Sequence, residues 1–429
     1  MKYSLSLLSA ALLAASAALP AHANNIVPGS AQERPIVLQG GTLMTVSHGQ
    51  VEGDLLFEDG RITAIGAQIE RPDNAQVIDI TGHHVYPGLI ALDTTLGILE
   101  ISAVRATVDT NEVGLVTPEV STHTAYNADS QIIPTIRYNG ITHAQVVPQG
   151  NLVRGSSSLL NLDAWNHSDA LTRADVAMHV TWPAVGLSRS PWERRSAEEQ
   201  RRAQQEMRDA LTQTFTTARA YHTAKQAGSV SREDVRWEAM LGLFDGTKAL
   251  HVHADDRRQI SQALEFADEQ GVDVVIVGGR DAWMLADELA ARDVAVVFGD
   301  AYGLPARVDE AYDTAFATPA KLAAAGVDFA IAYPGNWDTR NLAFAAGHAV
   351  AFGLDHATAL YSVTLGPAKI MGVEQDLGSL EVGKSASLVV SRGDILDPLT
   401  HSVEYMFIDG RLVEMDNKQR QLWHKYQQR

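Results

Sequence analysis

The sequence predicts an α/β fold in which a (β/α)8 TIM-type barrel carries a small β-sandwich built from the N- and C-terminal segments. Two observations indicate this architecture. Apolar strands alternate with helical segments through the middle of the chain, and short strands separated by turns stand at both ends. Of the 429 residues, 45% are hydrophobic, which is enough apolar material for a substantial core.

The first 23 residues predict a signal peptide. Lys2 supplies a positive charge, residues 5–19 are mostly apolar, and Ala21-His22-Ala23 is a small-x-small cleavage pattern. A buried N-terminal helix is the alternative. The apolar stretch is short and interrupted by serine compared with a membrane span of about 20 residues. We therefore expect an exported protein, most simply in a bacterial periplasm, that makes no use of a membrane.

Strand-like segments at both ends of the chain predict one composite β-sandwich. Residues 34–79 contain short apolar runs between Gly-rich and Asp-Gly turns. Residues 379–415 repeat this style, with a turn at Asp409-Gly410. We assign residues 24–84 together with 373–429 to the β-sandwich and residues 85–372 to the barrel.

The middle of the chain alternates apolar strands with helices, which is typical of parallel βα units that are buried on both faces. The expected strands are 85–92, 141–147, 177–182, 248–253, 272–277, 294–298 and 327–332. The expected helices are 196–226, 256–270, 282–291, 309–325 and 339–352. One of the eight strands of a barrel stays unassigned. A doubly wound open sheet is the alternative, but no glycine fingerprint follows a first strand.

Composition excludes several classes of protein. The chain has no cysteine, which excludes a disulfide scaffold, a thiolate metal site and a cysteine nucleophile. Its 34 basic and 52 acidic residues give a net charge of −18. A protein that binds a phosphate backbone needs the opposite sign, so we expect no nucleic acid partner.

Several short motifs stand along the chain. They are Ile78-Asp79-Ile80-Thr81-Gly82, residues 85–90 (VYPGLI), 139–142 (NGIT), 325–327 (AGV), 349–354 (AVAFGL), 364–370 (TLGPAKI) and 378–384 (GSLEVGK). In this order and spacing they resemble the amidohydrolase superfamily, and are most similar to its imidazolonepropionase-like branch. The resemblance implies a (β/α)8 barrel with a flanking β-sandwich. It also implies hydrolysis of C–N bonds in small amides, cyclic amides or peptide-like molecules, with one or two divalent ions at the C-terminal mouth of the barrel.

Most of the metal ligands that the resemblance implies are replaced here. It implies a His-x-His after the first barrel strand, one His each at strands five and six, and an Asp at strand eight that is also the general base. Asp93 and Thr95 stand in place of the His-x-His, and His253 keeps the position at strand five. Strand six has no His at Val277-Gly278-Gly279, and the first acid after strand eight is Asp338.

A rebuilt site for zinc or a similar divalent metal is one interpretation of this pattern. It would use Asp93, His251, His253 and Asp338, because His251 and His253 point to the same side of a strand. No bound metal is the alternative, and metal-free acid–base chemistry by Asp93, Asp255 and Asp338 is a third. The other histidines, such as His123, His143 and His179, have no surrounding motif, and we expect them to be structural or at the surface.

Two further segments carry residue types that can serve in catalysis or ligand binding. Gly155-Ser156-Ser157-Ser158 lacks the Gly-x-Ser-x-Gly of a nucleophile elbow, and we expect a plain turn before a strand at 159–162. The turn at residues 278–281 contains Arg280, which suits a substrate carboxylate at a helix N-terminus. Capping of that helix by Asp281 explains the turn equally well.

Two functions therefore stay open. The chain is either an exported amidohydrolase that cleaves a C–N bond in a small molecule, or a catalytically silent relative. The silent relative would bind a small ligand or pair with an active amidohydrolase homologue, because a site without its ligands cannot activate water. Fold alone does not decide between them. Homo- or hetero-oligomers are expected from the resemblance.

Overall fold

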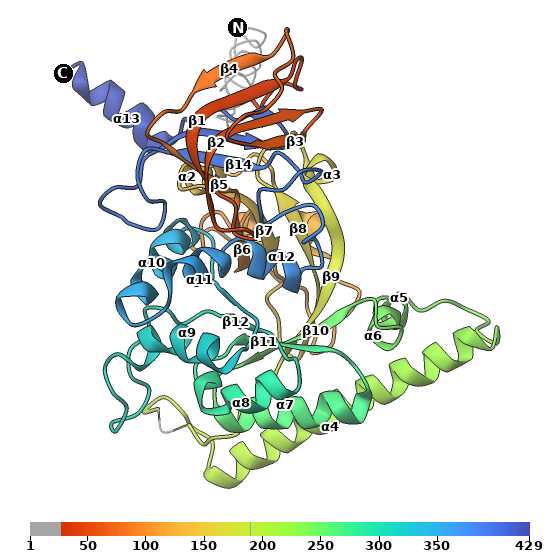
Figure 1. Cartoon of the computed structure of the whole chain (residues 1–429). Helices are drawn as coiled ribbons and strands as arrows, with labels where there is room; N and C mark the ends of the chain where they lie inside the picture. The colour runs from red at the N-terminus through yellow and green to blue at the C-terminus, as the bar shows by residue number, and fades with distance from the viewer. Residues whose placement is uncertain (1–26, 189) are drawn as a thin grey trace, which may run out of the picture.

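The computed structural model describes residues 27–188 and 190–429, so the predicted signal peptide lies outside the described residues. Two sheets organise the described part of the chain, one in the middle of the molecule and one at its end (Figure 1). Helices lie on the outside of the central sheet. This arrangement confirms the predicted α/β barrel fold.

The central sheet has eight strands in the order β13-β12-β11-β10-β9-β8-β7-β6. Their bounds are β6 Leu89–Thr94, β7 Ile141–Val146, β8 Val153–Asn161, β9 Leu171–Thr181, β10 Ala249–Ala254, β11 Val274–Gly278, β12 Val296–Phe298 and β13 Phe329–Ile331. The first and last strands meet where Thr94 forms a bridge with Gly335, and the Thr95 N–H donates to the Gly335 carbonyl at 3.0 Å. The sheet is therefore nearly closed into a barrel.

The eighth barrel strand is β8, of which only the C-terminal part was expected, as the strand at 159–162. It runs antiparallel to both of its neighbours, β7 and β9. The serine-rich segment 155–158, expected to be a turn, is part of this strand. Ser156, Ser157 and Ser158 are all buried. Buried serines break the apolar run by which strands are recognised, so the pattern concealed both the strand and its direction.

The segment expected to form one strand over residues 85–92 forms two. β5 (His84–Pro87) belongs to the second sheet, and β6 begins the barrel. Gly88 separates them, and a Cβ atom at this position would lie 2.2 Å from Oγ1 of Thr142. Only glycine allows the backbone to pass this close to β7 as it crosses from one sheet to the other.

The second sheet combines strands from both ends of the chain in the order β16-β15-β14-β5-β1-β2-β3, with β4 paired to β1. The remaining bounds are β1 Ile36–Met44, β2 Gln50–Glu58, β3 Arg61–Gly66, β4 Gln76–Asp79, β14 Leu388–Ser391, β15 Val403–Ile408 and β16 Arg411–Leu412. Phe57 and Phe407, from opposite ends of the sequence, pack edge to face with ring centroids 5.0 Å apart. The exact domain boundaries near residues 84 and 373 stay a prediction.

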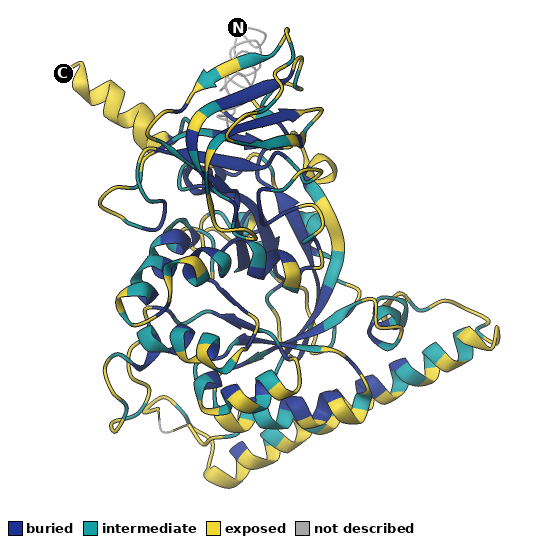
Figure 2. Cartoon of the chain, viewed as in Figure 1, coloured by how far each residue is buried: buried dark blue, intermediate teal, exposed yellow. Residues whose placement is uncertain are grey.

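The helices have the following bounds. They are η1 Arg105–Thr107, η2 Thr122–Ala125, α2 Ile133–Arg137, α3 His167–Ala170, α4 Ala197–Gln226, α5 Val235–Glu238, α6 Leu241–Phe244, α7 Arg257–Gln270, η3 Ala282–Leu285, α8 Ala286–Ala291, α9 Thr314–Ala325, η4 Asp338–Asn341, α10 Leu342–Ala351, α11 His356–Tyr361, α12 Leu365–Ile370 and α13 Lys418–Gln427. The long helix α4 runs along one end of the barrel and buries Leu211, Phe215 and Ala218 (Figure 2). Among the described residues, no helix is both long enough and apolar enough to span a bilayer.

The interior of the barrel is apolar on one side and polar on the other. Ile90, Leu92, Val277 and Ala332 belong to one buried apolar cluster. On the opposite strands, inward positions carry polar side chains that are also buried. These are Gln145 on β7, Ser157 on β8, His179 on β9 and His251 on β10. The polar side of the interior leads up to the mouth of the barrel.

Candidate functional site

A cavity of about 410 Å³ lies at the C-terminal mouth of the barrel, and we refer to it as the mouth cavity. Its charged and polar lining residues are Asp93, Arg154, Thr181, His253, Asp255, Gln259, Arg280 and Asp300. Trp182 and Pro334 supply apolar wall. Residues from the ends of several strands thus converge on one space, which is the usual position of a functional site in such barrels.

The reversed direction of β8 explains how Arg154 reaches the mouth cavity. Arg154 is the second residue of β8, and the start of an antiparallel strand lies beside the ends of its parallel neighbours. Its Nε donates to Oγ1 of Thr181 at 2.7 Å, and its Nη1 donates to Nε2 of His253 at 3.3 Å. Burial lowers the pKa of Arg154, whereas the nearby Asp93 carboxylate raises it.

The contact with Arg154 fixes the protonation of His253. A guanidinium can only donate hydrogen bonds, so Nε2 of His253 must be the acceptor and carries no proton. His179 Nδ1 lies 2.9 Å from the same nitrogen and must therefore donate to it. The lone pair that a metal ion would need is shared between these two donors.

A chain of hydrogen bonds continues from His179 into the barrel. Nε2 of His179 accepts from Ser157 Oγ at 2.7 Å, and Ser157 Oγ accepts from Nε2 of Gln145 at 2.9 Å. Oε1 of Gln145 accepts from the backbone N–H of Asp93 at 3.2 Å. Each of these contacts joins a donor to an acceptor, so the chain from Asp93 to His253 is held by hydrogen bonds between protein groups.

Burial keeps the three neighbouring histidines His179, His251 and His253 neutral. The ring of His179 lies 5.0 Å from that of His251 and 5.2 Å from that of His253, measured between centroids. Burial lowers the pKa of His251 to about 3 and those of His179 and His253 well below their usual value. His251 lies below the mouth, and its Nδ1 is buried with no hydrogen-bond partner among the described residues.

Asp93 is a carboxyl group held near neutrality. It ends β6 with a φ of 56°, a left-handed conformation that aspartate tolerates better than most residues. Burial raises the pKa of Asp93 to about 7, the Arg154 guanidinium lowers it, and the Asp255 carboxylate raises it. Asp93 is therefore able to accept or release a proton close to neutral pH.

Arg280 lies at the outer rim of the mouth cavity with Asp255 and Asp300. The expected cap by Asp281 is not made, because the Asp281 carboxylate accepts from Nη1 and Nη2 of Arg307 at 2.8 and 2.9 Å instead. The carboxylate also accepts from the Arg257 N–H at 3.1 Å. Nε of Arg280 is buried without a hydrogen-bond partner among the described residues. Nε of Arg280 nevertheless lies 3.7 Å from Oδ1 of Asp281, so its positive charge is partly paired.

The structure brings together some of the residues that the sequence indicates and leaves others apart. Asp93, His253 and Arg280 line the same cavity, and His251 lies directly below it. Asp338 is in η4, where its side chain is 62% exposed and pairs with Arg340 at 3.4 Å. Asp338 is not among the residues that line the mouth cavity.

The residues present do not fit a divalent metal. Within the described residues, no three His, Cys, Asp or Glu side chains are arranged to hold a metal ion. Nε2 of His253 already accepts from Arg154, and a second cation beside that guanidinium would be repelled. Thr95 is buried and offers a neutral hydroxyl. The donor set therefore differs in kind from the His-rich set that the resemblance implies.

Sequence reasoning missed Arg154 and Asp300. Arg154 was hidden because β8 was not assigned, and no local motif marks an arginine at the start of a reversed strand. Asp300 lies two residues after the end of β12, and an acid just beyond the end of a barrel strand is a signal that could have found it. His179, expected to be structural, is buried and fully hydrogen-bonded.

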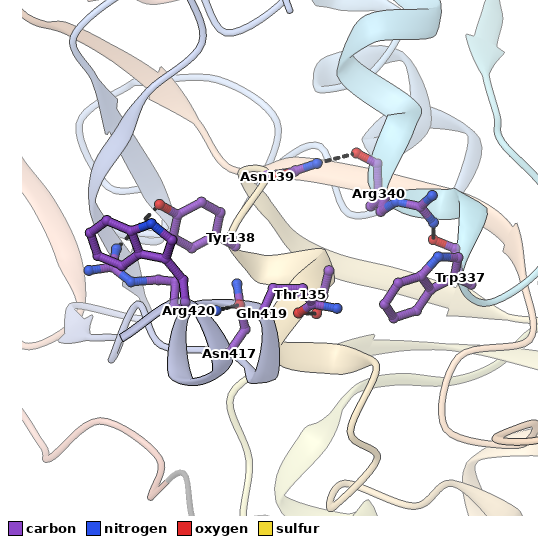
Figure 3. A pocket seen from close by; sticks show the side chains of 9 residues that line it. Thr135, Tyr138, Asn139, Trp337, Arg340, Asn417, Gln419 and Arg420 are labelled. Atoms are coloured by element: carbon purple, nitrogen blue, oxygen red, sulfur yellow. Dashed lines mark hydrogen bonds between the residues drawn. The ribbon is translucent and has the colours of Figure 1, made fainter. Parts of the chain in front are cut away.

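A second cavity lies outside the barrel, as a groove of about 620 Å³ beside α13 (Figure 3). Tyr138 and Arg420 stand at one side of it and Trp337 and Arg340 at the other, as Figure 3 shows. This groove is larger than the mouth cavity, but no Asp, Glu or His is among its lining residues. The mouth cavity is therefore the better candidate for chemistry.

Comparisons with known proteins agree with the architecture. A family model described as the amidohydrolase family matches residues 309–413. The amidohydrolase tasK of Hapsidospora irregularis is 23% identical over 401 residues, which is 83% of this chain and 39% of that protein. A dihydroorotase of Mycobacterium tuberculosis is 49% identical over 43 residues, 10% of each protein. The chain thus spans about two-fifths of the first of these relatives and a tenth of the second.

Solved structures share the fold. An amidohydrolase from Thermotoga maritima superposes with a TM-score of 0.79 at 24% identity, covering 88% of this chain and 99% of that one. An adenosine deaminase from Xanthomonas campestris with bound zinc gives a TM-score of 0.50 at 17% identity, covering 92% and 97%. Proteins of this fold thus include one that carries zinc.

Proposed function

We propose that this chain, which belongs to the amidohydrolase superfamily, binds a small organic molecule in the mouth cavity and performs no metal-dependent hydrolysis. The observation that carries the proposal is the contact between Arg154 and His253. It places a fixed positive charge against the ring nitrogen that would otherwise bind a metal ion. The family is usually metal-dependent, so this chain departs from its relatives in the chemistry of the site rather than in its fold.

The geometry of the mouth cavity supports ligand binding. The cavity has the size of a small-molecule site, and charged groups of both signs converge on it. Arg154 has five N–H donors and uses one toward Thr181 and one toward His253. Its remaining N–H groups are left for water or a ligand, because Arg154 lines the cavity. N–H donors without an acceptor raise the free energy of the folded protein, unless water or a ligand accepts their hydrogen bonds.

Metal-free hydrolysis of a C–N bond is a second candidate, and the state of Asp93 favours it. This carboxyl group has a pKa of about 7 and lines the mouth cavity. It could take a proton from an attacking water, as a general base does. Without a metal to polarise the scissile carbonyl, a cationic group such as Arg154 would have to stabilise the developing oxyanion.

Elemental analysis of the purified protein, combined with thermal unfolding, tests the proposal. We expect less than a tenth of an equivalent of Zn, Fe, Mn or Ni, and no rise in Tm when these ions are added. A full equivalent of metal that is lost in His253→Ala would overturn the proposal. Hydrolysis of N-acyl amino acids that survives chelation and is lost in Asp93→Asn would favour the second candidate.

Two expectations about the cellular context stay proposals. The residues at 1–23 support export to a periplasm, and N-terminal sequencing of the protein from a periplasmic extract would test it. An oligomer with a homologue is supported only by the resemblance. Light scattering of the purified chain tests self-association directly.

A further inference from the structure

We infer that the mouth cavity recognises a zwitterion of the amino-acid type, with its carboxylate on Arg154 and its ammonium group between Asp255 and Asp300. This inference rests on the proposed function, because it assumes a ligand in a site that holds no metal. It adds the chemical class of the ligand and the direction in which it lies.

The inner end of the mouth cavity is cationic. Arg154 is anchored there by Thr181 and His253, so its planar fork is held in place before any ligand arrives. A guanidinium held in this way suits the bidentate geometry of a carboxylate. Nε2 of His253 accepts from both Arg154 and His179, so among the described residues the guanidinium of Arg154 has no carboxylate as a hydrogen-bond partner.

The outer end is anionic. Asp255 follows β10 and Asp300 follows β12, and both line the cavity. The carboxylates of Asp255 and Asp300 repel each other. Burial raises the pKa of Asp300 most, and the Asp255 carboxylate raises it further. The backbone makes room for these side chains: a Cβ atom on Gly278 would lie 2.6 Å from Oδ1 of Asp255. An ammonium group between two carboxylates would relieve their repulsion.

Arg280 lies at the anionic end and offsets part of its negative charge, because its guanidinium lowers the pKa of Asp300. Its backbone N–H donates to Oδ1 of Asp255 at 3.4 Å, and its Nε, which has no hydrogen-bond partner among the described residues, lies 3.7 Å from Oδ1 of Asp281. The Asp281 carboxylate also accepts from Arg307. The Nη groups of Arg280 are left to contact a second polar group of the ligand, such as a side-chain or peptide carbonyl.

The balance of charge favours a zwitterion over an ion of one sign. A small anion on Arg154 would leave Asp255 and Asp300 facing each other, and a small cation at the rim would leave Arg154 without an anion. The cavity volume of about 410 Å³ suits a molecule of the size of an amino acid or dipeptide. A ligand with separated charges satisfies both ends at once.

Isothermal titration calorimetry of the full-length protein tests this class. The probes are the twenty free amino acids and glycylglycine, followed by the N-acetyl and carboxamide derivatives of the tightest binder. We expect each derivative to bind at least tenfold more weakly than the parent zwitterion. Equal affinity of the parent and both derivatives would overturn the inference.

Paired variants locate the two ends of the ligand. In Arg154→Met the preference for the acid over the carboxamide should fall below about threefold, while the preference for the free amine persists. Asp300→Asn should show the reverse. Arg202→Met and Glu206→Gln, an exposed pair on α4, are the charge-matched controls and should change neither preference. Loss of both preferences in each variant, with unchanged circular dichroism, would contradict the assigned direction.

Failure of this inference can be told apart from failure of the proposed function. If no zwitterion binds, but neutral or anionic molecules of similar size raise the Tm of the wild type and not of Arg154→Met, the ligand class is wrong and the metal-independent site stands. If a stoichiometric metal is found in the purified protein, the proposed function itself is wrong.

Discussion

Nη1 of Arg154 lies 3.3 Å from Nε2 of His253, and these two residues come from strands β8 and β10 on either side of β9. No sequence motif marks Arg154, whereas His253 is the one position where the chain keeps a metal ligand that the resemblance implies. The mouth of the barrel thus carries the positive charge of a guanidinium in place of the metal ion that the resemblance implies. A guanidinium binds anions through donated hydrogen bonds but cannot convert water into a nucleophile as a metal does.

Removing this guanidinium should alter the ionisation of Asp93. Arg154 lowers the pKa of Asp93, so Arg154→Met should raise that pKa above its value of about 7. The shift is measurable by carbon NMR of carboxyl-labelled aspartate, with Asp93→Asn identifying the signal. Arg258→Met removes an exposed arginine that pairs with Asp256 and serves as the control. An unchanged pKa in Arg154→Met would mean that the two groups do not interact.

The sequence was sufficient to predict the barrel, because apolar strands buried on both faces leave a strong local pattern. β10, β11, β12 and β13 were all expected close to their observed positions. The first part of β8 was not, because Ser156, Ser157 and Ser158 are buried through hydrogen bonds rather than apolar contact. A strand of that kind is recognisable only with its partners in place.

The candidate site was harder to predict for a related reason. His253 was indicated by a resemblance, but what it binds depends on Arg154, which lies 99 positions away in sequence. Asp338 was indicated because it is the first acid after the last barrel strand. The segment after β13 instead turns outward, and Asp338 pairs with Arg340 at the surface. Such relationships are set by tertiary structure and leave no trace in local spacing.

The buried histidines should make the protein sensitive to acid. His251 has a folded pKa of about 3, against about 6.5 for an unfolded chain, and His179 and His253 are lowered as well. The unfolded state therefore binds more protons below pH 6.5, and the free energy of unfolding falls as the pH drops from there toward the folded pKa values. Each histidine contributes a slope of up to about 1.4 kcal/mol per pH unit.

His251→Met isolates one of these contributions. Urea denaturation of this variant between pH 4.5 and 7.5 should show a shallower loss of stability than the wild type, by up to about 1.4 kcal/mol per pH unit. His424→Gln changes an exposed histidine on α13 and should follow the wild-type slope. Parallel curves for His251→Met and the wild type would show that His251 titrates normally in the folded state.

Breaking a buried ion pair should cost far more stability than breaking a surface pair. The carboxylate of Asp163, which is fully buried, contacts the guanidinium of Arg137 and accepts from the Gly29 N–H at 2.9 Å. Asp163→Asn leaves Arg137 buried without its counter-charge, so we expect a loss of about 3–5 kcal/mol in the free energy of unfolding. Urea denaturation measures it.

The matched control for this loss is Asp338→Asn. Asp338 also pairs with an arginine, but it is exposed, so its loss should cost at most about 1 kcal/mol. Similar losses for Asp163→Asn and Asp338→Asn would show that burial of the pair contributes little.

Gly278 should be needed both for the backbone conformation at this position and for the placement of the Asp255 carboxylate at the rim of the mouth cavity. Its φ is 91°, and a Cβ atom would meet Oδ1 of Asp255 at 2.6 Å. Gly278→Ala should therefore lose about 1 kcal/mol or more of stability and push the Asp255 carboxylate away from the cavity. Gly246 has a φ of 68° with no atom within 4 Å of its Cβ position, so Gly246→Ala bears the backbone cost alone. Calorimetry should show weaker binding of a zwitterion only in Gly278→Ala, and equal affinity in the two variants would mean that Asp255 does not contact the ligand.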